Sequence, residues 1–212
     1  STMQTDLLGT PMITSLAERN SVSKNNFRNV GTMIGYKHNF PKTGKEFTAD
    51  FTFNQSRSNS SNFITTDSLD FNTKNIVKSS SQRQDGLGAN KNYIFQADYV
   101  NPLTDKSKLE MGVRASIREV DNKNDFFLIS NGSAIYNPLL SVNYQSTDKV
   151  YAAYTTFTSQ VKNFGYQLGL RVESSDYQGV LPDKNQTFKI KFPVSFFPGV
   201  FLSEKMKNDQ EL

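Results

Sequence analysis

The chain alternates apolar and polar residues in several stretches, and segment 166–173 shows this pattern without a break. In its sequence YQLGLRVE, apolar residues occupy every second position from Tyr166 to Val172. A period of two is that of a β-strand, because successive side chains point to opposite faces of a sheet. Arg171 and Glu173, on the other face, suit water rather than a dry core. The segment therefore predicts a strand that separates an apolar medium from water.

Other parts of the chain repeat this pattern, and two kinds of connection join them. Including 166–173, the expected strands are 29–39, 47–54, 93–99, 109–118, 150–159, 166–173 and 188–205. Short turns are expected at 41–45, 102–106, 160–163 and 206–210, and longer polar connections at 55–91, 121–146 and 177–185. Because the two kinds alternate, an antiparallel sheet would carry the short turns at one end and the long connections at the other. Outer-membrane barrels have this asymmetry, with short periplasmic turns and long extracellular loops.

The expected fold is therefore all-β. We expect an antiparallel meander of long hairpins that forms a segment of an outer-membrane β-barrel. Residues 1–28 are weakly patterned and are expected to be a loop-like N-terminal segment, whereas residues 29–212 form the barrel segment. If the segment stands alone, an open or sandwiched sheet is the expected form.

Composition does not exclude a membrane location. Only 36% of the 212 residues are hydrophobic, and no apolar run reaches the roughly 18 residues of a membrane helix. A membrane strand, however, needs an apolar residue only at every second position, and its other face can be polar. The composition of a barrel wall can therefore resemble that of a soluble protein.

The sequence contains no constellation of catalytic residues. There is no cysteine, and His38 is the only histidine, so a histidine-based triad or metal cluster is not expected. Segment 121–125 resembles a calcium loop only superficially, because Lys123 occupies a ligand position. The net charge of +4 is scattered and forms no basic run. We therefore expect no enzyme, no cofactor, no metal site and no nucleic-acid partner.

Four stretches resemble the barrel of TonB-dependent outer-membrane receptors, and in particular the outer membrane protein β-barrel family. They are YQLGLRVE with the Tyr177 and Gly179 turn after it, the 36–44 hairpin, QADYVNPLTDKSKLEMGVRAS at 96–116, and FFPGVFLSEKM at 196–206. Their order and spacing fit over most of residues 29–212. Glu204 departs from the pattern, because it stands where the family leads us to expect an aromatic residue.

The resemblance implies a location in the outer membrane of a Gram-negative bacterium and a role in taking up a nutrient such as a glycan, a peptide or a metal chelate. It implies the lipid bilayer, the remainder of the barrel, a plug domain, a TonB complex and a surface lipoprotein as partners. Such barrels have about 22 strands. We therefore expect the chain to be a central portion of a larger barrel, without its plug.

A second hypothesis stays open at this point. A soluble β-sandwich or a cell-surface binding module, with no transport role, would also place an apolar residue at every second position. Under the receptor hypothesis, polar loops with a few aromatic side chains suit the capture of a solute. The candidate extracellular ligand contacts are Phe63, Phe71, Phe126, Phe127 and Tyr136.

Overall fold

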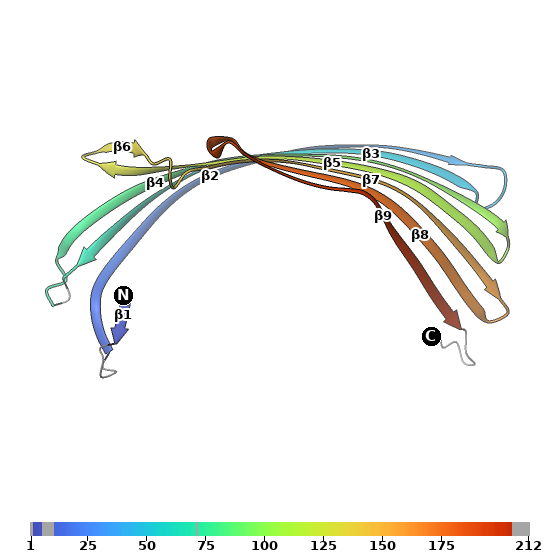
Figure 1. Cartoon of the computed structure of the whole chain (residues 1–212), viewed down its shortest axis with the longest axis horizontal. Helices are drawn as coiled ribbons and strands as arrows, with labels where there is room; N and C mark the ends of the chain where they lie inside the picture. Colours follow the sequence, from blue (N-terminus) through green and yellow to red (C-terminus); the bar gives the residue numbers. More distant parts are fainter. Residues whose placement is uncertain (1, 6–10, 71, 205–212) are drawn as a thin grey trace. The chain divides into compact units, whose positions relative to one another are not determined.

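The computed structural model describes residues 2–5, 11–70 and 72–204, and these residues are almost entirely β-structure (Figure 1). The strands are β1 (Thr2–Thr5), β2 (Pro11–Asn39), β3 (Glu46–Leu69), β4 (Ile76–Thr104), β5 (Ser107–Ser130), β6 (Ser133–Tyr136), β7 (Val142–Val161), β8 (Phe164–Leu181) and β9 (Gln186–Glu204). The helical structure in the described part is a single 3-10 turn, η1 (Pro182–Lys184). No helix there is long and apolar enough to cross a membrane.

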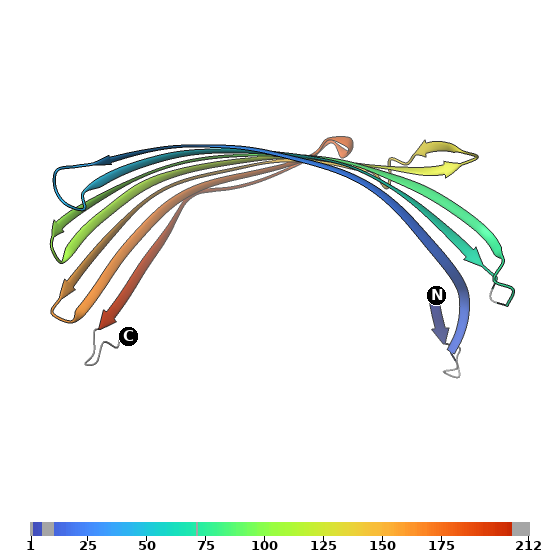
Figure 2. The same ribbon diagram turned by 180° about the vertical axis from the view of Figure 1, so that it is seen from behind.

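The strands form one antiparallel meander. Their order in the sheet is β1-β2-β3-β4-β5-β7-β8-β9, and β6 pairs with β5 beside this path. Both ribbon views show strands that follow one another in sequence lying side by side (Figure 1 and Figure 2). Strands β1 and β9 stand at the two ends of this order, so the described sheet is not closed. The expected all-β fold is thus confirmed.

Each of the seven alternating stretches of the sequence lies in one of the seven long strands β2, β3, β4, β5, β7, β8 and β9, except that residue 205 lies outside the described residues. The turns that join β2 to β3, β4 to β5 and β7 to β8 are short, as predicted. In the first of them, the Phe40 amide donates to the Lys45 carbonyl at 3.0 Å. The turn expected at 206–210 lies outside the described residues.

The polar connections differ from the prediction, because most of their residues lie in strands. β3 continues to Leu69 and β4 begins at Ile76, so the connection expected at 55–91 is a long hairpin with a turn of only a few residues. β5 continues to Ser130 and β8 to Leu181 in the same way. A strand that meets water on both faces needs no hydrophobic alternation, since the backbone ladder satisfies its polar groups. The sequence pattern therefore cannot reveal it.

The segment expected to be loop-like also contains extended chain. β1 spans Thr2–Thr5, and β2 begins at Pro11, well before the alternation starts at Asn29. These two strands pair antiparallel, with Met3 opposite Ile13. The weak patterning of residues 11–28 has the same explanation as that of the long connections.

Contacts divide the strands into two compact units. The first contains residues 1–28, 57–89 and 121–144, and the second contains residues 29–56, 90–120 and 145–212. In the second unit, β7 pairs with β8 from Val161 and Phe164 to Gln145 and Val180. β8 pairs with β9 in an unbroken register until an irregularity between Glu173 and Ser175. In the first unit, β5 and β6 form a hairpin in which Phe127 is opposite Tyr136.

A conventional hydrophobic core is missing from the described residues. Only two apolar side chains, Ile64 and Ala152, are buried there. Two packed sheets would bury their facing side chains in a core about 10 Å thick. The described strands instead belong to one sheet, so the structure gives no support to the soluble β-sandwich hypothesis.

Candidate functional site

One face of the second unit carries a network of polar side chains, and we call it the polar face. Tyr154 on β7 donates a hydrogen bond through its hydroxyl to the Asp98 carboxylate on β4. Strand β5 lies between these two strands. The Tyr154 ring crosses β5 at Gly112, where an added Cβ would collide with the ring. Glycine at this position therefore lets an aromatic side chain reach across one whole strand.

Side chains on either side of the Tyr154–Asp98 hydrogen bond extend the network. Gln96 donates to Asp98 at 2.8 Å, and Arg114 donates to Gln96 at 3.4 Å. The Arg171 guanidinium carbon lies 6.0 Å from the centre of the Tyr154 ring.

Further along β8, Arg171 donates to Glu173 at 2.8 Å. Ser175 donates to the other oxygen of the same carboxylate at 3.0 Å. Arg118 on β5 pairs through its Nε with Asp148 on β7 at 2.9 Å. Charged and hydrogen-bonding groups of this kind suit a surface that faces water.

A recess of about 670 Å³ lies at the short-turn end of this unit. Among the residues that line it are Pro102, Thr158, Gln160, Gln167 and Ser203. Gly165 belongs to the same surface, because an added Cβ there would lie 2.6 Å from the Ser203 hydroxyl oxygen. The recess is thus lined by polar and apolar groups together.

The opposite face of the second unit is apolar, and we call it the apolar face. Phe51, Phe95, Met111, Leu168 and Leu170 lie on it, and between 39% and 48% of each is exposed. The register continues this face onto β9, where Leu168 is opposite Val200. An uncovered apolar surface of this extent is unfavourable in water. It requires an apolar medium or a partner.

Aromatic side chains gather where this unit approaches its short turns. The Lys45 ammonium lies 4.9 Å from the centre of the Phe40 ring and 5.7 Å from that of Tyr99. His38 packs edge-on against Phe40 with ring centres 4.5 Å apart. The rings of Phe157 and Tyr166 form a further pair, with their centres 6.0 Å apart. Aromatic residues at the end of an apolar band are typical of the interface between membrane and water.

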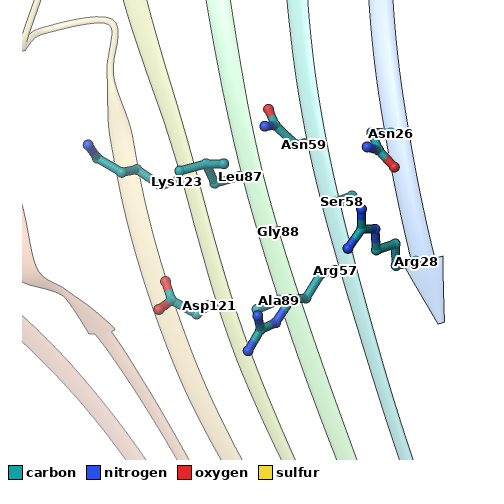
Figure 3. A pocket seen from close by; sticks show the side chains of 10 residues that line it. All are labelled: Asn26, Arg28, Arg57, Ser58, Asn59, Leu87, Gly88, Ala89, Asp121 and Lys123. Carbon is teal, nitrogen blue, oxygen red and sulfur yellow. The ribbon is translucent and has the colours of Figure 1, made fainter. Parts of the chain in front are cut away.

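The first unit carries a cationic recess of about 380 Å³ (Figure 3). Its lining residues come from β2, β3, β4 and β5, and they are Asn26, Arg28, Arg57, Ser58, Asn59, Leu87, Gly88, Ala89, Asp121 and Lys123. Three of them are cationic and one is anionic. Lys123 pairs with Asp125 at 2.8 Å. Within the described chain, neither Arg28 nor Asp121 has a hydrogen-bond or ion-pair partner. The sequence alone does not reveal this site, because its cations lie far apart along the chain.

The structure brings together only some of the expected ligand contacts. Phe127 and Tyr136 face each other across the β5–β6 hairpin, with ring centres 5.6 Å apart. The Arg83 guanidinium stacks on the Phe127 ring at 4.5 Å. Phe126 precedes Phe127 in the same strand and therefore points to the opposite face. Phe63 lies in β3, and Phe71 lies outside the described residues.

A single meander with one polar face, one apolar face and an aromatic border is the wall of a membrane β-barrel. The chain matches the model of the outer membrane protein beta-barrel family over residues 38–212 and belongs to this family. It is thus a protein of the outer membrane of a Gram-negative bacterium. The family expected from the sequence is confirmed.

Comparison with solved structures matches the chain to the ferric citrate transporter FecA in its unliganded form. The TM-score is 0.47, the sequence identity is 10%, and the match covers 92% of this chain and 34% of that chain. The chain thus spans about a third of the length of that structure. No curated protein matches the chain.

Proposed function

We propose that this chain is part of a TonB-dependent receptor that takes up a bulky nutrient across the outer membrane. The nutrient would be a glycan, a peptide or a metal chelate. The observation that carries the proposal is the polar face, in which charged and hydrogen-bonding side chains line a sheet whose other face is apolar. In a barrel, such a face surrounds a water-filled lumen.

The lumen gives the polar groups two roles. The groups around Asp98, Tyr154 and Arg171 would keep the wall hydrated, rigid and able to exchange hydrogen bonds with a passing solute. The recess at the short-turn end, whose lining combines polar and apolar groups, would receive a plug domain. A TonB complex on the periplasmic side and a surface lipoprotein on the outer side would be the further partners. The chain itself contributes no chemical step.

The long β3–β4 and β5–β6 hairpins would then lie on the extracellular side. Among the expected ligand contacts, Phe126 belongs to the same alternating set as Arg114 and Arg118 on β5. We assign the first contact with solute to this water-facing set and to the hairpin tips. Phe63, Phe127 and Tyr136 would form the outer wall of the hairpins.

The test shortens the β3–β4 hairpin in the full-length receptor. Ser61 and Asp85 face each other at 2.7 Å across β3 and β4. Replacing residues 60–86 by Asn-Gly should therefore close a short hairpin at the same place. We expect the barrel to insert into the outer membrane while uptake of the natural solute, and growth that depends on it, falls at least tenfold.

The matched control replaces only residues 70–75 by Asn-Gly and keeps both strands. Uptake should then stay within about twofold of the wild type. Unchanged uptake by the shortened receptor would show that this hairpin takes no part in capture. Absence of the full-length protein from the outer-membrane fraction would contradict the uptake proposal altogether.

A further inference from the structure

We infer that the cationic recess binds the phosphate groups of an anionic lipid in the outer leaflet of the membrane. The inference rests on the location of the family in the outer membrane and is independent of the proposed uptake. The recess lies on one side of the strands, and the alternation of side chains identifies that side. On one side of the first unit, a Cβ added at Gly88 would meet the Ser58 hydroxyl at 2.5 Å and the Asn122 side-chain oxygen at 3.1 Å. The side chains of Arg28, Arg57, Asp121 and Lys123 belong to the other alternating set (Figure 3).

That other set is the one that carries the apolar residues along the same strands. On β3, Arg57 has the same parity as Phe51 and Phe53, and Asp50 and Asn54 belong to the opposite set. On β5, Lys123 has the parity of Met111, opposite to that of Gly112. The strand alternation thus assigns the cations of the recess to the same face of the strands that meets lipid further along them.

The position of the cations along each strand fits the head-group layer. Arg28 lies two residues from Val30, and Arg57 lies four residues from Phe53. Val30 begins the alternating apolar run of β2 and Phe53 ends that of β3, so both mark the end of the run that is nearer to the recess. The head-group layer is about 5–8 Å thick on each side of the hydrocarbon core. A few residues of a tilted strand cover this depth.

The charge of the recess fits a phosphate rather than a neutral sugar. Arg28, Arg57 and Lys123 outnumber the single carboxylate of Asp121 in the lining, and a net charge of +1 remains when Asp125, the partner of Lys123, is counted as well. Arg28 has no partner among the described residues and offers a planar set of donors, which matches the oxygens of a phosphate. Asn26 and Asn59 add neutral donors to the same lining. Leu87 and Ala89 provide an apolar floor on which the first carbons of an acyl chain can rest.

The experiment titrates purified lipid A into the full-length receptor in a non-ionic detergent and counts bound lipids by native mass spectrometry. We expect the wild type to bind lipid A and the double variant Arg28→Gln/Arg57→Gln to bind it at least tenfold more weakly, because each lost charged hydrogen bond costs about tenfold. Dephosphorylated lipid A should bind the wild type as weakly as lipid A binds the variant. Inorganic phosphate should compete only at far higher concentration than lipid A.

Two further variants test whether the charge of the recess determines the binding of lipid A. Asp121→Asn removes the only carboxylate of the recess and should tighten the binding of lipid A severalfold. Lys78→Gln/Lys184→Gln removes the same two positive charges from β4 and η1, outside the recess, and should leave binding within about twofold of the wild type. Equal binding by the wild type and the Arg28→Gln/Arg57→Gln variant would overturn the inference. The inference would also be overturned if the Arg28→Gln/Arg57→Gln variant lost a co-purifying protein while its binding of lipid A stayed unchanged.

Discussion

At the scale of single residues, Gly112 holds together the polar face because it lets Tyr154 reach Asp98. Gly112→Ala in the full-length protein should displace the Tyr154 ring and weaken its bond to the carboxylate. We expect a loss of about 1–3 kcal/mol in the free energy of unfolding, measured with urea in detergent micelles. Gly169→Ala is the matched control, because it lies between β7 and β9 and an added Cβ there would meet its nearest atom, the Thr156 hydroxyl oxygen, at an ordinary 3.7 Å. In a Tyr154→Ala background, the cost of Gly112→Ala should largely vanish, and its persistence would contradict this account.

The sequence alone could not reveal this bond. Tyr154 and Asp98 are separated by 56 positions, and their contact depends on the register of three strands. Alternation along a strand shows which residues share a face, but it does not show which residues of neighbouring strands lie opposite one another. The isolated glycine in the middle of the run 109–118 was the one available signal, since a glycine within a strand often marks a close approach.

A second residue, Asp70, organises the turn between β3 and β4. Its carboxylate accepts hydrogen bonds from the backbone amides of Thr73 at 2.8 Å and Asn72 at 3.1 Å. The Thr73 backbone amide is the main cause that lowers the pKa of Asp70 below its ordinary value of 3.8. Because the folded pKa is lowered, the carboxylate stabilises the turn above pH 3.8, and this contribution is lost as the pH falls through the folded pKa.

Hydrogen exchange of the turn amides tests this assignment. Asp70→Ala should reduce the protection of the Asn72 and Thr73 amides at pH 7, whereas Asp67→Ala in the adjoining strand should leave it unchanged. In the wild type, protection corrected for the intrinsic exchange rate should be high at pH 7 and should fall below pH 3.8. Protection that is independent of both Asp70 and pH would contradict the capping role.

At the scale of elements, the two faces of β8 should tolerate a charge very differently. Leu170 lies on the apolar face, whereas Gln167 belongs to the polar set. Leu170→Arg should destabilise the folded barrel in lipid vesicles by about 2–4 kcal/mol, the cost of an arginine near the middle of the membrane. Gln167→Arg should change stability by less than about 1 kcal/mol. Equal effects of the two substitutions would show that the faces of β8 are wrongly assigned.

The elements that could be predicted from the sequence are those with lipid on one side and water on the other. Segment 166–173 is such an element, and β8 contains it. The remainder of β8, from Ser174 to Leu181, was expected to belong partly to a connection. The apolar set there gives way to Ser174, Asp176 and Gln178, so the hydrophobic contrast disappears while the backbone ladder continues. The cationic recess lies in regions of this kind, which explains why its place on strands was not predicted.

At the scale of the whole molecule, an open sheet with an uncovered apolar face should not stay monomeric in water. Strand β9 stands at the end of the sheet order and leaves one edge without a partner among the described strands. Open edges and apolar faces recruit other chains. The 212-residue chain, expressed by itself, should form dimers or larger aggregates in plain buffer and should disperse in detergent. A monodisperse monomer in sedimentation without detergent would contradict this expectation.

The central claim is that alternate residues of these strands face lipid and water, and spin labelling measures this directly. The chain has no cysteine, so a single cysteine can be placed at each position from 166 to 173 and labelled. In the full-length protein, reconstituted in vesicles, labels at 166, 168, 170 and 172 should collide mainly with oxygen, which dissolves in lipid. Labels at 167, 169, 171 and 173 should collide mainly with a water-soluble nickel chelate. A period of two between these reagents is the predicted result, and equal accessibility at neighbouring positions would contradict the account.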